Sequence, residues 1–206
     1  MILALLLAAA TPVQMSAIDA ERAFAADAQR QGQWTAFRKW STPDALMFVP
    51  QPTKTRDFLK GRKDPPVSVY WWPGRSYVSC DGKTAINTGP WVRGYGKSVG
   101  YFTTVWVRQP DGAWKWVYDA GDEDKFMRGE GGDIAPVKAP CPTTALPPLP
   151  KRDQQPNVII GGGSSADGTL TWGWTVARSG ERNFFALQWD GKKRQMVVED
   201  KVAAPK

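Results

Sequence analysis

The sequence predicts an α+β protein: N-terminal helices packed on a curved antiparallel sheet, followed by a C-terminal three-stranded antiparallel β-meander. Three observations support this fold class. Residues 18–40 carry apolar side chains at helical spacing, residues 67–119 contain short β-rich runs separated by turn dipeptides, and residues 170–202 alternate apolar and polar side chains. Helices followed by hairpin-connected strands are typical of α+β domains rather than of alternating α/β folds.

The N-terminal part is expected to form two helices. Residues 18–31 are rich in alanine, and Asp19 and Glu21 suit the positive end of the helix dipole. Gly32 interrupts this segment, and residues 33–40 form the second helix. The inner face of the second helix is expected to carry three aromatic residues spaced three apart: Trp34, Phe37 and Trp40.

A β-meander is expected to follow a short strand at 45–49 and one or two helical turns at 55–61. Asp81-Gly82 and Asp111-Gly112 separate β-rich runs, and this dipeptide is a strong hairpin signal. Gly89-Pro90, inside a run, predicts a bulge or a sheet edge. The expected strands of this meander cover residues 67–72, 75–80, 84–92, 99–108 and 113–119.

The chain is expected to divide into four segments. These are a signal peptide (1–17), an α+β domain (18–128), a Pro/Gly-rich linker (129–156) and a β-meander that packs on the first domain (157–206). Within the last segment, Gly161–Gly163 is expected to be a flexible turn rather than a phosphate loop, since no GK[ST] ending follows.

The apolar run at residues 1–10 has the length of a signal-peptide core and is too short to span a bilayer. We therefore expect an exported protein, periplasmic or secreted, with no transmembrane segment. No Lys or Arg precedes the run, and Met15 stands where a small residue is preferred for cleavage. A buried N-terminal helix is the alternative interpretation of this run.

The residue counts exclude several kinds of chemistry. The 206 residues contain no histidine, which excludes Ser–His and Cys–His catalysis and histidine zinc sites. Cys80 and Cys141 form an even pair, which in an exported protein predicts a disulfide; two separate free thiols are the alternative. With no histidine and no CxxC motif, no metal site is expected, and no cofactor is expected either.

The net charge of +7 favours acidic or anionic partners in general. The basic residues are scattered, however, and the densest clusters are only Lys60–Lys63 and Lys192–Arg194. This distribution is typical of solvated loops, so we expect no nucleic-acid partner. Attachment to an anionic envelope surface through these loops is a further hypothesis, and it predicts salt-dependent binding.

Several motifs resemble the nuclear-transport-factor-2-like superfamily, also called SnoaL-like or cystatin-like. The motifs are Ala20–Ala25, Gly32–Trp34, Asp44–Val49, Gly100–Trp106 and the closing hairpin Asp111–Asp119. The resemblance covers roughly residues 19–121 and is strongest to small exported bacterial members of unknown function.

This resemblance implies a sheet curled around a helix into a cone, whose open end accepts small molecules in some members. It also implies a homodimer. The enzymes of the superfamily, ketosteroid isomerases and polyketide cyclases, use a carboxylate base with hydrogen-bond donors to an oxyanion. Many relatives carry histidine around the final strand of the cone, where this chain has Tyr118 and Ala120.

Asp119, at the end of the closing hairpin, is the candidate catalytic base, because an apolar lining would raise its pKa. The alternative is a structural carboxylate that pairs with Arg108 or Lys125. Asp27 is a second candidate and is expected to face solvent on its helix. The expected catalytic group consists of Asp119, Tyr118 and Tyr101.

Eight of the eleven tryptophans fall in the first domain. Aromatic side chains can form the wall of a ligand pocket, or they can fill the core of a small domain. The candidates for a pocket are Trp34, Trp40, Trp72, Trp91, Trp106 and Trp116. This density favours a non-enzymatic exported module that binds a small apolar or aromatic ligand or a protein partner. The alternative is an isomerase- or cyclase-like enzyme that uses Asp119 and a tyrosine donor.

Overall fold

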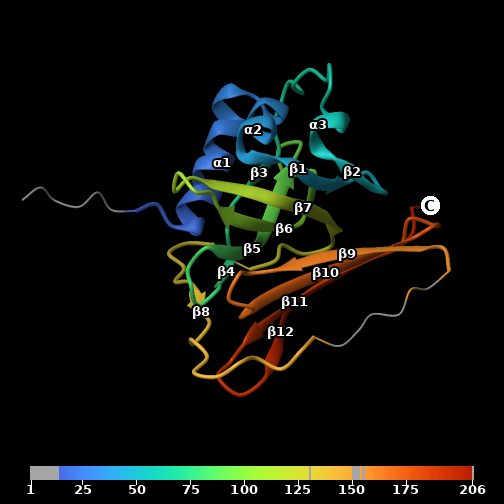
Figure 1. Cartoon of the computed structure of the whole chain (residues 1–206). Coiled ribbons are helices and arrows are strands. Elements are labelled where there is room, and N and C mark those ends of the chain that lie inside the picture. Colours follow the sequence, from blue (N-terminus) through green and yellow to red (C-terminus); the bar gives the residue numbers. More distant parts are fainter. Residues whose placement is uncertain (1–13, 130, 150–153, 155, 206) are drawn as a thin grey trace, which may run out of the picture.

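The computed structural model describes residues 14–129, 131–149, 154 and 156–205 (Figure 1). The first helix, α1 (Ala17–Gln31), begins after a capping box: the Ser16 hydroxyl accepts a hydrogen bond from the Asp19 amide at 3.1 Å, and the Asp19 carboxylate accepts one from the Ser16 amide. Most of the expected signal peptide, residues 1–17, lies outside the described residues.

Two further helices follow, α2 (Gln33–Trp40) and α3 (Thr55–Phe58). Gly32 separates α1 from α2 with a φ of +107°, and a Cβ atom at this position would meet the Asp64 carboxylate at 2.3 Å. That carboxylate accepts hydrogen bonds from the amide and the hydroxyl of Thr35, at 2.9 and 2.6 Å. The break between the helices is therefore fixed by the close approach of Asp64.

An eight-stranded curved sheet lies against the helices (Figure 1). Its strands run in the order β2-β1-β7-β6-β5-β4-β8, and β3 also pairs with β5. The pairs β1–β7 and β4–β8 are parallel, so the sheet is mixed rather than wholly antiparallel. The strands are β1 (Ser41–Phe48), β2 (Pro52–Lys54), β3 (Tyr70–Trp71), β4 (Arg75–Val78), β5 (Thr84–Arg93), β6 (Ser98–Arg108), β7 (Trp114–Asp124) and β8 (Val137–Lys138).

A second sheet packs on the opposite face of the first (Figure 1). This sheet is antiparallel, with the strand order β12-β11-β10-β9. It has four strands, whereas the sequence predicted three. The α+β fold class, with helices before a curved sheet and a separate C-terminal sheet, is confirmed. The strands are β9 (Val158–Ser164), β10 (Leu170–Ala177), β11 (Arg182–Trp189) and β12 (Arg194–Val202).

The extra strand β9 contains the glycines that were expected to form a flexible turn. Gly161 pairs with Trp174 and Gly163 pairs with Trp172 on β10. A Cβ atom at Gly161 or Gly163 would lie 2.1 or 2.4 Å from atoms of these indole rings. The glycines thus allow two tryptophan rings to lie flat over the neighbouring strand, which is a known role of glycine in sheets.

Cys80 and Cys141 form the predicted disulfide, with a Cα–Cα distance of 5.1 Å. It joins the turn after β4 to the segment after β8, which is part of the stretch expected to be a linker. Gly89-Pro90 was expected to mark a bulge or a sheet edge. Toward β6 the pairing of β5 is unbroken from Thr84 to Arg93. On the other side of β5, the two residues lie opposite the gap between β3 and β4, where the register shifts by one residue between the pairs Trp71–Trp91 and Arg75–Thr88. None of the helices in the described part of the chain is long and apolar enough to cross a membrane.

Two buried clusters, one on each face of the large sheet, form the core. The first lies between the helices and the concave face and includes Phe24, Trp106 and Trp116, none of which is exposed. The second lies between the convex face and the C-terminal sheet and includes Val105, Tyr118 and Phe184. The large sheet is therefore covered on both faces.

Candidate functional site

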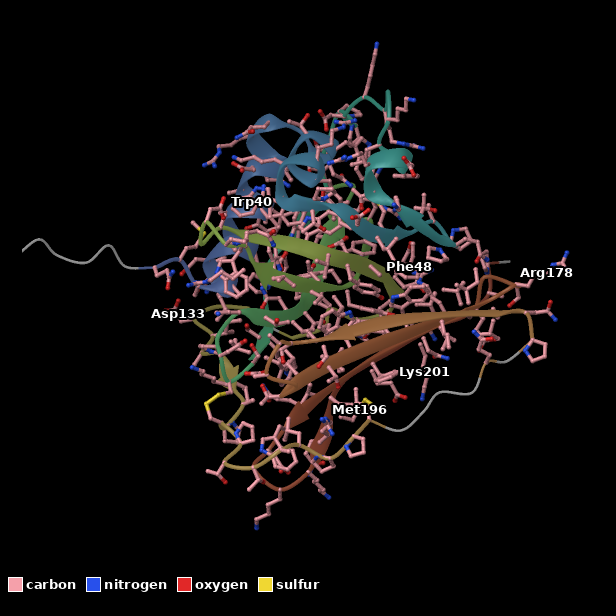
Figure 2. All side chains as sticks on the ribbon, in the orientation of Figure 1. Trp40, Phe48, Asp133, Arg178, Met196 and Lys201 are labelled. Carbon is pink, nitrogen blue, oxygen red and sulfur yellow. A yellow bond between two sulfur atoms is a disulfide. The ribbon has the colours of Figure 1, made fainter. Side chains whose placement is uncertain are left out.

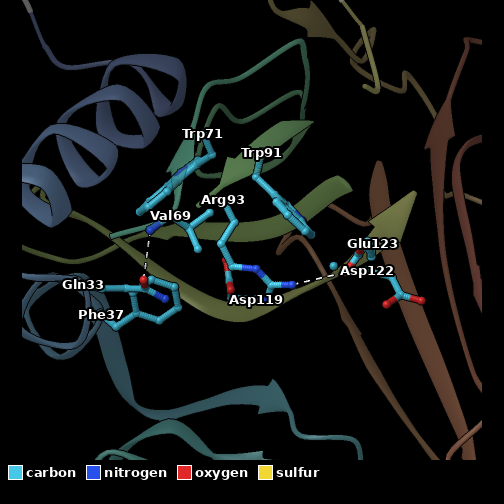
Figure 3. A pocket seen from close by; sticks show the side chains of 10 residues that line it. Gln33, Phe37, Val69, Trp71, Trp91, Arg93, Asp119, Asp122 and Glu123 are labelled. Carbon is cyan, nitrogen blue, oxygen red and sulfur yellow. Dashed lines mark hydrogen bonds and ion pairs between the residues drawn. The ribbon is translucent and has the colours of Figure 1, made fainter. Parts of the chain in front are cut away.

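A pocket of about 310 Å³ opens at the concave side of the large sheet, and we call it the cone pocket (Figure 3). Helix α2 contributes Phe37, β3 contributes Trp71, β5 contributes Trp91 and Arg93, and β7 contributes Asp119. The pocket therefore has aromatic walls, and a carboxylate is one of the side chains that line it.

A β-bulge in β7 sets the direction of the Asp119 side chain. Trp106 pairs with Trp116, but its neighbour Val105 pairs with Tyr118, so Val117 is an extra residue in β7. Beyond this extra residue the alternation resumes shifted by one, with Tyr118 on the convex face and Asp119 on the concave face. The bulge thus turns a carboxylate into the pocket.

Burial raises the pKa of Asp119 from its ordinary 3.8 to about 7. Among the described residues, the only hydrogen-bond donor to this carboxylate is the Thr104 hydroxyl on β6, at 2.8 Å, and this bond lowers the pKa by a smaller amount. A carboxyl group with a pKa near 7 can bind or release a proton at neutral pH, as a general base requires.

A second carboxyl group, Glu21 on α1, is completely buried behind the pocket. It accepts hydrogen bonds from the indole nitrogens of Trp71 and Trp106, at 2.9 and 2.6 Å, and from the Asn87 amide at 3.3 Å. Its pKa is raised from 4.5 to about 8, mainly by burial; the nearby Asp119 charge also raises the pKa, and these hydrogen bonds lower it. Glu21 therefore holds the Trp71 side chain that lines the pocket.

Sequence reasoning missed the role of Glu21, which it assigned only to the helix dipole. The signal that could have found it is helical spacing. Glu21 precedes Phe24 by three residues and therefore shares the buried face of α1 with it. An acidic residue on an otherwise apolar helix face indicates a buried carboxyl group with specific donors.

Charged and amide groups define the rim of the pocket. Arg93 forms an ion pair with Glu123 at 3.2 Å, and both side chains are more than half exposed. The guanidinium carbon of Arg93 lies 5.4 Å from the centre of the Trp91 ring. On the opposite side, the Gln33 carbonyl oxygen accepts a hydrogen bond from the Val69 amide at 3.1 Å, as Figure 3 shows.

Of the predicted pocket tryptophans, only Trp91 lines the cone pocket. Trp106 and Trp116 are fully buried and belong to the core, and Trp34 and Trp40 pack half-buried against it. Trp72 lies outside the pocket, with its ring 5.5 Å from that of Tyr70. The neighbouring Trp71 lines the pocket in its place because strand alternation sends the two rings in opposite directions.

The expectation that Tyr118 and Tyr101 share the pocket wall with Asp119 is wrong. Both tyrosines face the C-terminal sheet, on the other side of the β6–β7 hairpin. The Tyr118 ring packs 4.6 Å from that of Phe184, and the Arg128 guanidinium lies 3.6 Å from the centre of the Tyr101 ring. No tyrosine lines the pocket among the described residues.

Arg108 and Asp27 also lie in surroundings that differ from those expected. Arg108, the partner of Asp119 in the alternative interpretation, instead donates a hydrogen bond to the Met15 carbonyl. Asp27 does not face solvent: it is only 4% exposed. Burial alone would raise the pKa of Asp27, but hydrogen bonds from Lys39, Trp40 and Arg30 hold it below its ordinary value. Asp27 therefore has a structural role: it forms ion pairs with Arg30 on α1 and with Lys39 on α2, next to Trp40, which Figure 2 labels.

In the described part of the chain, no group of three or more Cys, Asp or Glu side chains is arranged to hold a metal ion. The aromatic walls and the carboxyl group of the cone pocket could bind a small organic molecule, and the carboxyl group could exchange a proton with it.

No family model matches the chain, and no curated protein matches it. Similar solved structures include a candidate ketosteroid isomerase from Parabacteroides distasonis, which is 18% identical in sequence, with a TM-score of 0.43. The match covers 56% of this chain and 94% of that chain. A candidate ketosteroid isomerase from Shewanella frigidimarina is 16% identical, with a TM-score of 0.39; the match covers 52% of this chain and 95% of that chain. An NTF2-like superfamily protein from Salmonella enterica is 13% identical, with a TM-score of 0.39; the match covers 56% of this chain and 94% of that chain.

Proposed function

We propose that this chain is a binding module for a small apolar or aromatic molecule, which occupies the cone pocket without being chemically changed. The observation that carries this proposal is the pocket itself, whose volume of about 310 Å³ is bounded by the rings of Phe37, Trp71 and Trp91. Concave sites of this size with aromatic walls are typical of small-ligand sites. The two tyrosines that were expected to donate hydrogen bonds to an oxyanion, Tyr101 and Tyr118, face away from the pocket.

We further propose that the module is exported. The apolar run at residues 1–10 supports this proposal, and so does the disulfide between Cys80 and Cys141. Disulfides persist in oxidising compartments and are rare in the cytosol.

Indole can test the binding proposal, since it is small, neutral and aromatic. In amide-detected NMR titrations, we expect shifts confined to residues 33–37, 69–71, 91–93 and 119–123. Val69→Phe should abolish them, because Val69 lines the pocket and a larger side chain fills it. Val67→Phe is the matched control, since Val67 is 44% exposed and does not line the pocket. Absence of shifts at millimolar indole, or shifts that persist in Val69→Phe, would refute the proposal.

One observation favours a second candidate function, an enzyme that removes a proton next to a carbonyl group. Asp119 lines the pocket with a pKa raised to about 7, which suits a general base at neutral pH. The developing oxyanion would have to be stabilised by the Gln33 carboxamide, since its carbonyl oxygen is held by the Val69 amide while its NH₂ group is a neutral donor at the pocket wall.

Phenylacetone in deuterated water tests this second candidate. The Asp119 carboxylate would take a proton from the carbon between the ring and the carbonyl group, and solvent would return a deuteron. We expect an exchange rate that rises with pH through about 7, because only the ionised form of Asp119 is a base. Asp119→Asn should reduce the rate to that of buffer. If the wild-type protein exchanges no faster than buffer, the enzyme candidate is rejected.

A further inference from the structure

We infer that the ligand of the cone pocket is a small cation with an aromatic or apolar body, whose positive group pairs with the Asp119 carboxylate. This inference rests on the proposed function, binding of a small molecule in that pocket, and specifies the chemical class of the ligand. It is carried by the walls of the pocket and by the distribution of charge around it.

The walls of the pocket suit a cation. Figure 3 shows the Trp71 and Trp91 rings on one side of the space and the Phe37 ring on the other. Faces of aromatic rings attract cations, and tryptophan is the best of them. The Arg93 guanidinium, 5.4 Å from the Trp91 ring centre, already lies within the range of such an interaction. An ammonium group in the pocket would therefore meet electron-rich surfaces as well as a carboxylate.

The charges around the pocket leave Asp119 without a counter-ion. Arg93 is paired with Glu123 at the rim, so its charge is already balanced. Across the described residues, Asp119 forms no ion pair, and its hydrogen bond comes from the neutral Thr104 hydroxyl. A cationic ligand would supply the missing charge. A carboxylate or phosphate ligand would instead be repelled by Asp119, although the chain as a whole carries a net charge of +7.

Binding of such a cation would be coupled to release of a proton. A positive group beside Asp119 stabilises the ionised form and lowers its raised pKa, whereas a neutral ligand lacks this effect. The other charged and titratable groups around Asp119 are Glu21 from α1, Arg93 from β5, and Tyr118, Asp122 and Glu123 from β7 itself. The residues that pair with Asp119 across the sheet, Met47 on β1 and Thr104 on β6, do not titrate.

Three indole derivatives that differ in one end group provide the test: tryptamine (cationic), tryptophol (neutral) and indole-3-acetate (anionic). Titration calorimetry is performed on the full chain at pH 8.5 and pH 5.5. At pH 8.5 we expect tryptamine to bind about tenfold more tightly than tryptophol, with indole-3-acetate the weakest. At pH 5.5 the preference for tryptamine should largely disappear, since Asp119 is then protonated while the amine is still charged. Near pH 7, in buffers of different ionisation enthalpy, tryptamine binding should release protons and tryptophol binding should not.

Variants separate the two proposals. Asp119→Asn keeps the shape of the side chain and should remove the preference for tryptamine while tryptophol still binds. Asp133→Asn, an equal change of net charge at an exposed residue, should leave the preference unchanged. If tryptophol binds as tightly as tryptamine at pH 8.5, the cation inference is wrong and the binding function stands. If none of the three derivatives binds, the binding function itself fails.

Discussion

At the scale of single residues, Asp119 and Glu21 show how two carboxyl groups with raised pKa values can have different roles. Asp119 lines the pocket and accepts one hydrogen bond from protein, so its protonation can respond to a ligand. Glu21 is sealed from solvent and accepts three hydrogen bonds, two from indole nitrogens. A buried carboxyl group with that many donors acts on the position of its neighbours rather than on a substrate.

The raised pKa of Glu21 predicts that stability falls as pH rises. Its pKa is about 8 in the folded chain and about 4.5 in the unfolded chain, so the folded state binds more protons between these values. The free energy of unfolding should therefore decrease from about pH 4.5 to about pH 8, by an amount on the order of a few kcal/mol. Asp119 contributes in the same direction up to about pH 7. Urea denaturation at pH 5, 6.5 and 8 measures this slope.

Glu21→Gln should make the slope shallower, since it removes one of the two titrating groups. It should also destabilise the protein at pH 5 by about 1–3 kcal/mol, because its amide leaves one buried indole donor, of Trp71 or Trp106, without an acceptor. Glu181→Gln, at an exposed turn, is the control and should keep the wild-type slope. A Glu21→Gln variant with an unchanged slope would contradict the raised pKa.

At the scale of elements, local signals were sufficient for most helices and hairpins. The alanine-rich segment before Gly32 forms α1, and Asp111-Gly112 turns between β6 and β7 as expected. The parallel pairs β1–β7 and β4–β8 join segments far apart in the chain, and no local pattern indicates them. The strand β9 was missed because three consecutive glycines favour a turn, and only their tryptophan partners on β10 explain a strand there.

The candidate site was predictable only in part for a related reason. Asp119 and Trp91 were named from sequence and line the pocket. The alternation rule failed for Tyr118 because the extra residue Val117 shifts every side chain after it to the other face. A bulge depends on how two strands pair, so period-2 reasoning on one strand cannot detect it. The same one-residue uncertainty explains why Trp72 was predicted to line the pocket, whereas its neighbour Trp71 does so.

At the scale of the whole molecule, the large sheet is shared between two cores, one under the helices and one under the C-terminal sheet. Polar contacts accompany the second core. The Asp200 carboxylate on β12 pairs with Arg128 at 2.5 Å and accepts a hydrogen bond from the Thr103 hydroxyl on β6 at 2.8 Å. The Gln188 amide on β11 donates to the Val78 carbonyl on β4 at 3.1 Å. These contacts oppose separation of the two sheets because separation would leave buried polar groups unpaired.

We therefore predict that the two sheets unfold as one cooperative unit, although the sequence places them in separate segments. The apolar face of the C-terminal sheet packs against the convex face of the large sheet, so separating the two sheets would expose the apolar side chains of both to water. Native-state hydrogen exchange should give the same opening free energy for amides of β10–β11 as for those of β5–β6.

Asp200→Asn should lower both opening free energies by roughly 2–4 kcal/mol, since it leaves the partly buried Arg128 charge unpaired. Glu199→Gln, an exposed neighbour on β12, should change both by less than about 0.5 kcal/mol. If β10–β11 opens at a lower free energy than β5–β6, or if Asp200→Asn affects only the C-terminal sheet, the sheets are independent units and the shared core does not couple them.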